Sequence, residues 1–70
     1  MKFNLNIKEV EFYKKEISYA DIIQMAGYKP DAIVTVTISM PNGQGISLTP
    51  GSMTMGQEGM NVTAVITNNA

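Results

Sequence analysis

Few side chains in this sequence could carry acid–base, nucleophilic or metal chemistry. The 70 residues contain no cysteine and no histidine, which removes the usual thiol nucleophile, general base and metal ligands. Ser18 stands three residues before Asp21. That spacing is typical of a helix-capping box, and no base is available to activate the serine as a nucleophile. The sequence therefore predicts no catalytic residue, no metal site and no cofactor, and we expect a protein that is not an enzyme.

The charged residues are unevenly distributed along the chain. The formal net charge is −1, and Glu58 is the only charged residue after Asp31. Nothing in this charge balance favours nucleic acid or a membrane surface as a partner. No apolar run approaches the ~18 residues of a membrane span, and no signal peptide is evident. We therefore expect a cytoplasmic protein. The uncharged C-terminal half predicts a sheet face that could bind a partner at low desolvation cost. The alternative is an ordinary solvated surface rich in threonine.

One short helix is predicted over residues 19–26. Ser18 and Asp21 have the capping-box spacing, and Ile17 and Ile22 occupy the positions of a hydrophobic staple. Gly27 stands where a left-handed residue commonly ends a helix. A single apolar face is formed by Tyr19, Ile22, Ile23 and Ala26. At about two turns, such a helix must pack on a sheet to be stable.

Alternating apolar and polar residues predict strands in the rest of the chain. The pattern covers residues 1–7, 10–14, 32–40, 46–48 and 60–67, with a first turn at Lys8-Glu9. Residues with a shared inward phase are expected to form the core: Phe3, Leu5, Ile22, Ala26, Val34, Val36, Leu48, Val62 and Ile66. Met53, Met55 and Met60 are expected to fill gaps in this core, and the alternative is an adaptable binding surface.

Ile33 and Val65 are the candidate partner surface. Both lie on the face of their strands opposite the predicted core. If these two strands pair, Ile33 and Val65 form an exposed apolar spot on a face that is otherwise threonine and asparagine. The alternative is two scattered surface aliphatics, which need no explanation.

The predicted order is strand, strand, helix, strand, short strand, strand. The clean alternation in the first and last strands favours their pairing at the centre of the sheet, with the helix crossing one face. This predicts an α+β fold of the β-grasp type, a mixed four- to five-stranded sheet with one short helix packed on one face. Another small α+β roll remains open. Residues 1–67 would form the domain, and residues 68–70 a flexible tail.

The chain resembles bacterial ubiquitin-like proteins of the multiubiquitin type. The resemblance rests on residues 17–22 and 25–27 around the helix, on the segment 48–53, and on 59–62 before the last strand. It implies a β-grasp protein modifier that is activated at its C-terminal carboxylate. The implied partners are an adenylating enzyme, a carrier or conjugating enzyme, a JAB-type peptidase and target proteins.

The C-terminus departs from the pattern of this family. Ubiquitin-type modifiers and sulfur carriers end in Gly-Gly, whereas this chain ends in Asn68, Asn69 and Ala70. Alanine adds one methyl group, so a narrow adenylating cleft could still accept it, either as encoded or after trimming of a precursor. These three residues are the candidate conjugation tail. The alternative is a ubiquitin-like binding module that is never conjugated and docks through its sheet face or an edge strand. A sulfur carrier is disfavoured by the missing Gly-Gly.

Overall fold

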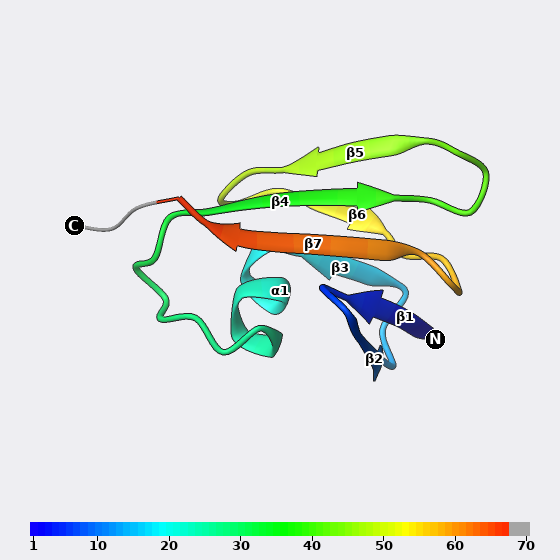
Figure 1. Cartoon of the computed structure of the whole chain (residues 1–70), viewed down its shortest axis with the longest axis horizontal. Helices are drawn as coiled ribbons and strands as arrows, with labels where there is room; N and C mark the ends of the chain where they lie inside the picture. Colours follow the sequence, from blue (N-terminus) through cyan, green and yellow to red (C-terminus); the bar gives the residue numbers. More distant parts are fainter. Residues whose placement is uncertain (68–70) are drawn as a thin grey trace.

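The fold is built on a mixed five-stranded sheet (Figure 1). The computed structural model of the chain describes residues 1–67. The strand order is β2-β1-β7-β4-β5, with β1 at Lys2–Leu5, β2 at Lys8–Glu11, β4 at Val34–Ser39, β5 at Gly45–Leu48 and β7 at Asn61–Ile66. The predicted α+β class is confirmed, as is the pairing of the first and last strands. These two run parallel, with Leu5 opposite Val62.

The inner face of the sheet is set by the register of its antiparallel pairs. β4 lies between β7 and β5, so Val36 has Ala64 on one side and Leu48 on the other. All three side chains are buried. Successive strand residues point to opposite faces, so the threonines that alternate with these residues in β4 and β7 point outward. The alternation in the sequence therefore predicts correctly which side chains of these strands face the core.

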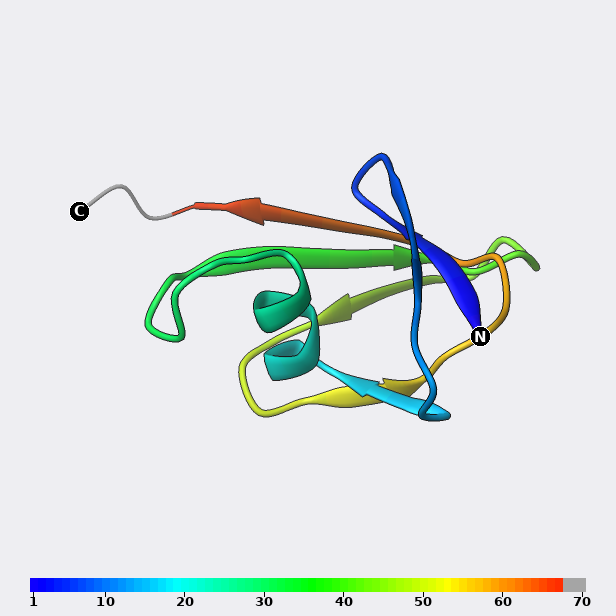
Figure 2. The same ribbon diagram turned by 90° about the horizontal axis from the view of Figure 1, so that it is seen from below.

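Helix α1, Tyr19–Met25, packs on the inner face of the sheet (Figure 2). It begins with the predicted capping box at Ser18 and is followed by Gly27 in the left-handed region, with φ +81°. Ile22 and Ile23 are buried beneath it. The Tyr19 hydroxyl accepts a hydrogen bond of 3.1 Å from the buried backbone N–H of Val34, which ties the start of the helix to the start of β4.

A separate two-stranded ribbon was not predicted. β3, Glu16–Ser18, pairs antiparallel with β6, Met53–Met55. Ile17 is fully buried, so its neighbours Glu16 and Ser18 point outward. Met55 and Met53, which pair with these two residues, point outward as well. Met53 and Met55 are accordingly 59% and 56% exposed, and the prediction that they fill the core is wrong. Strands of three residues are too short to show a period in the sequence.

The core contains most of the residues predicted for it. Seven of the nine are at most 5% exposed: Phe3, Leu5, Ile22, Val34, Val36, Leu48 and Val62. Ala26 is only partly buried against this cluster. Ile66 is 43% exposed, so its assignment to the core is wrong. Its phase is inward, but the end of β7 extends past the helix (Figures 1 and 2). Met60 is fully buried, as predicted.

The first hairpin turns earlier than predicted. Leu5 pairs with Lys8, so the two-residue turn is Asn6-Ile7 and not Lys8-Glu9. Asn6 adopts a left-handed φ of +57°, which asparagine tolerates better than most residues. Ile7 follows the inward alternation in the sequence, yet it is fully exposed at the tip of the hairpin. The alternation alone does not reveal that the strand has already ended.

Candidate functional site

The C-terminal end of β7 brings the two predicted partner-surface residues together. The backbone N–H of Thr67 donates to the carbonyl oxygen of Ile33 at 2.8 Å, and its hydroxyl donates to the same oxygen at 3.1 Å. Val65, two residues before Thr67, lies opposite Thr35. Ile33 and Val65 are therefore diagonal neighbours on the outer face of the sheet. They are 55% and 52% exposed.

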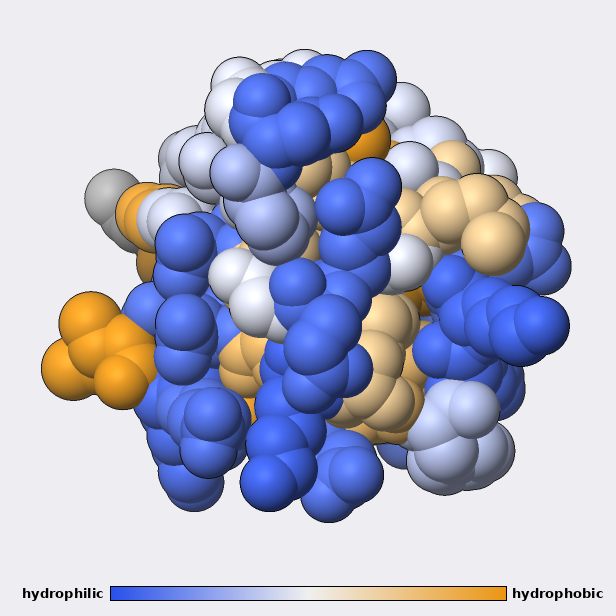
Figure 3. Space-filling view, turned by 90° about the vertical axis from the view of Figure 1, so that its right-hand side faces the viewer, coloured by the Kyte–Doolittle hydropathy of each residue, from blue (hydrophilic) through white to orange (hydrophobic). Residues whose placement is uncertain are grey.

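Ile66 adds a third exposed apolar side chain at this end of the sheet. It lies between Val65 and Thr67 in the chain and points toward the opposite face, where Val34 is its buried partner. We call Ile33, Val65 and Ile66 the exit patch, because β7 ends here. Figure 1 places this end of β7 at the left of the molecule, away from the N-terminus and the β4–β5 turn. The opposite end of the molecule is mainly hydrophilic (Figure 3).

Two side chains hold the last part of β7 where β1 no longer reaches it. The backbone N–H of Ala64 donates to Asn6 Oδ1 at 2.9 Å, and the Ala64 carbonyl accepts from the Tyr28 hydroxyl at 3.1 Å. β4 holds the other side of β7 through the regular ladder. Asn6 and Tyr28 thus position the exit patch without belonging to it. Neither role is predictable from the sequence, because both bonds join residues far apart in the chain.

The outer face beside the exit patch is polar and uncharged. β4, β5 and β7 contain no charged residue, and their outward positions are exposed. A shallow depression of ≈ 320 Å³ lies across these three strands, and its outer-face lining includes Thr37, Ser39, Ser47, Asn61 and Thr63. Hydroxyl and amide groups cost less to desolvate than charges do. This face can therefore be covered by a partner at a modest cost.

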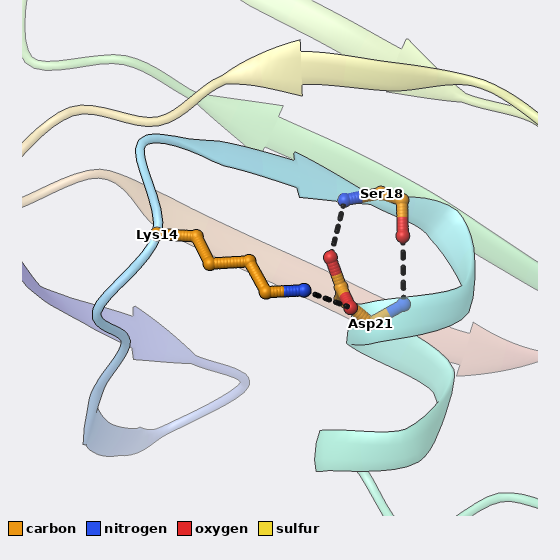
Figure 4. A network of polar contacts seen from close by, with 3 residues as sticks. All are labelled: Lys14, Ser18 and Asp21. Carbon is orange, nitrogen blue, oxygen red and sulfur yellow. Dashed lines mark hydrogen bonds and ion pairs between the residues drawn. The ribbon is translucent and has the colours of Figure 1, made fainter.

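The residues that the sequence singles out for chemistry are engaged in the helix cap (Figure 4). The Ser18 hydroxyl accepts from the Asp21 N–H, and the Asp21 carboxylate accepts from the Ser18 N–H, both at 3.0 Å. Lys14 Nζ lies 4.0 Å from Asp21 Oδ1, and the lysine side chain is 56% exposed. A pair at this distance with an exposed lysine contributes little to stability. The geometry matches the cap assignment of Ser18 and Asp21.

Other kinds of site are not evident in residues 1–67. That part of the chain holds no group of three or more Asp, Glu, His or Cys side chains placed to bind a metal ion. Nor does it contain a helix long and apolar enough to cross a membrane. The candidate conjugation tail, Asn68, Asn69 and Ala70, lies outside the described residues. The exit patch and the uncharged outer face are the features on which we base a function.

Comparisons with known proteins found no relative for this chain. No protein-family model, curated protein or solved structure matches it. The class of protein must therefore be argued from the topology, the exit patch and the chemistry of the residues themselves.

Proposed function

We propose that the domain is a β-grasp of the ubiquitin-like type and that the chain acts as a small protein modifier. The support is the topology. Two strands, a helix on one face, and three further strands give a sheet in which the first and last strands run parallel side by side. The bacterial multiubiquitin type is the relationship that the sequence resemblance suggests for it.

The observation that carries the proposal is the position of the exit patch. β7 is the central strand of the sheet and leads directly into residues 68–70. Thr67, the last described residue, is bonded to Ile33, so the residue that precedes the tail lies beside the patch. An enzyme that binds Ile33 and Val65 would hold the start of the tail close to the reactive centre of that enzyme. Such positioning converts activation of the carboxylate into an effectively intramolecular step.

The chemistry belongs to the partner enzyme and to the carboxylate at the end of the tail. In a form of the chain that ends at Ala70, encoded or trimmed, a carboxylate oxygen of Ala70 attacks the α-phosphorus of ATP, and pyrophosphate leaves, so that an acyl adenylate forms. A thiol or amine nucleophile of a carrier or target then attacks the acyl carbon, and AMP departs with the bonding electrons. A JAB-type peptidase would reverse the linkage. Small uncharged side chains at Asn68, Asn69 and Ala70 would allow the tail to enter a narrow cleft.

The test compares two aspartate substitutions on one strand. Val65→Asp places a charge in the exit patch, and Thr63→Asp places the same charge on the same face two residues earlier. Each variant is incubated with ATP and a candidate activating enzyme, and the acyl adenylate and covalent adducts are measured by mass. We expect Val65→Asp to lower adenylate formation about tenfold or more, because an unpaired charge at a buried contact is costly.

Thr63→Asp serves as the control for folding and for the general effect of an added charge, and it should keep most of the activity. Ala70→Trp should abolish the adenylate without changing the melting temperature. Equal activity of Val65→Asp and wild type would remove the exit patch from the proposal. Absence of any adenylate on wild type, with an activating enzyme shown to be competent on its own substrate, would contradict the modifier function.

The second candidate is a binding module that is never conjugated. The uncharged outer face of β4, β5 and β7, with its shallow depression, favours it. Such a module would bind its partner equally well with Ala70→Trp as with the wild-type tail. A modifier that carries Ala70→Trp would not be activated. The tail variant therefore separates the two functions directly.

A further inference from the structure

The two edges of the five-stranded sheet differ in how they are protected. β2 forms one edge and carries Lys8, Glu9 and Glu11. β5 forms the other edge with the sequence Gly45-Ile46-Ser47-Leu48, which has no charge and no proline. Among residues 1–67, no strand pairs with the outer side of β5, and Figure 1 shows it at the upper border of the sheet. Charged residues and prolines are the usual protection of a sheet edge against pairing with another chain.

The hydrogen-bond pattern shows which backbone groups of β5 face outward. Met40 N–H donates to the Gln44 carbonyl at 2.8 Å, just beyond the end of the β4–β5 ladder. In an antiparallel pair, bonded positions recur every second residue, so Ile46 and Leu48 bond to β4. Gly45 and Ser47 therefore direct their N–H and carbonyl groups away from the sheet. Thr49 is already engaged by Ser52 at both its N–H and its carbonyl.

From this pattern we infer that β5 pairs antiparallel with β5 of a second copy of the chain, about a two-fold axis at Ile46. Gly45 then lies opposite Ser47 of the second copy, and the reverse holds on the other side of the axis. Each such pair exchanges two backbone hydrogen bonds. Ile46, which is partly buried, meets its own counterpart at the axis and is covered by it. The result is a continuous sheet across both copies.

Charge explains why a second copy fits this edge. A two-fold contact brings each residue against a residue of the same strand, so any like charges there would repel one another. β5 has no charge to oppose itself. At the other edge, formed by β2, the backbone groups of Glu9 and Glu11 face away from the sheet. If β2 paired with β2 of a second copy about an axis at Val10, Glu9 of each copy would lie opposite Glu11 of the other. The chain thus opposes self-pairing at one edge and permits it at the other.

The contact is small, because only four residues of β5 take part. It falls well below the area of a stable dimer, so we expect a transient association with a dissociation constant of about 1 mM. Such an association can matter where copies are held close together. It does not depend on conjugation, since β5 is on the sheet border and the exit patch lies at the end of β7.

The test uses three forms of the full chain. The Gly45→Glu/Ser47→Glu double variant sets glutamates against each other across the axis, as β2 would. The Gly45→Lys/Ser47→Glu variant substitutes the same positions but sets opposite charges against each other. Both positions are exposed, and an added side chain at Gly45 meets nothing within 4 Å, so both variants should fold. Self-association is measured by sedimentation equilibrium and by amide shifts in NMR over a concentration series.

Wild-type chain should associate, with the largest concentration-dependent amide shifts at residues 45–47. The Glu/Glu variant should associate about tenfold more weakly, and the Lys/Glu variant at least as strongly as wild type. A wild-type chain that stays monomeric above about 1 mM would overturn the inference. So would association that the Glu/Glu variant leaves unchanged, or shifts centred on Met53–Met55, which would place the contact on the β3–β6 ribbon.

Discussion

The β1–β2 and β4–β5 hairpins have equivalent inner faces and contrasting outer faces. Leu5 and Leu48 face the same core and are each 5% exposed. On the outer face, β2 carries Glu9 and Glu11, whereas β5 and its neighbour β4 carry no charge. Folding demands an apolar inner face from both hairpins and demands little of either outer face. The difference between their outer faces is therefore informative about contacts with other molecules.

The contrast continues along β7, which lies between the two hairpins. Its parallel partner β1 contributes Lys2 and Asn4, and its antiparallel partner β4 contributes only threonine and serine to the outer face. The exit patch is on the β4 side, since Ile33 directly precedes β4. The surface that we propose for partners thus lies at the start of β4 and the end of β7. The charged N-terminal hairpin remains a solvated border.

The largest effect is expected from truncating the core in either hairpin. Leu5→Ala and Leu48→Ala should each lower the free energy of unfolding by about 2–5 kcal/mol, because each removes buried methyl groups and leaves a cavity. The measurement is chemical denaturation of the two variants beside wild type. A cost below about 1 kcal/mol for one leucine only would show that its hairpin does not share the common core.

A smaller loss is expected where a tyrosine hydroxyl holds β4. Tyr19→Phe leaves the buried N–H of Val34 without its acceptor and should cost about 1–3 kcal/mol. Tyr13→Phe is the matched control, because Tyr13 is 89% exposed and follows the charged hairpin. Thermal unfolding of both variants checks this expectation. Equal melting temperatures would mean that water replaces the tyrosine hydroxyl at Val34.

The helix cap between the two hairpins should contribute less again. Ser18→Ala removes the acceptor of the Asp21 N–H and should cost about 1 kcal/mol. Ser18→Asn keeps a capping oxygen and should restore most of that loss. Urea denaturation of the pair distinguishes the cap from a general effect of substitution. An alanine variant as stable as wild type would contradict the assigned role of Ser18.

The smallest effect is expected on the outer faces themselves. Thr37→Lys adds a charge to the uncharged face and Glu9→Gln removes one from the charged border. Each should change the free energy of unfolding by no more than about 0.5 kcal/mol, because both side chains are exposed. Denaturation curves that overlay wild type would show that folding does not require the uneven charge. A large loss for Thr37→Lys would make the uncharged face a requirement of the fold.

The sequence predicts those parts of the fold where local signals and burial agree. The cap at Ser18, the left-handed Gly27 and the inward and outward positions of β4 and β7 follow from spacing and alternation alone. Ile7 and Ile66 continue the inward alternation but lie beyond the part of the sheet that is covered, which no local pattern reveals. The β3–β6 ribbon is held by pairing between distant segments and is too short to show a period.

The positions of the residues in the candidate site are predictable to a similar extent, and their role as a partner surface stays a prediction. Ile33 and Val65 follow from the outward phase of two strands that pair, and their exposure agrees with that phase. The contribution of Asn6 and Tyr28, which hold Ala64 from the side where β1 has ended, requires the three-dimensional structure. The tail function of Asn68, Asn69 and Ala70 stays a prediction.

The central claim is that the carboxylate at the end of the tail is joined to other proteins. The most direct measurement is the mass of the chain and its adducts recovered from the cells that make it, followed by mapping of the linkage. We expect a fraction of the 7.6 kDa chain to be linked through the Ala70 carboxylate to an amine of a target, and none with Ala70→Trp. Recovery of the free chain alone, in cells whose activating enzyme is present and active, would contradict the claim.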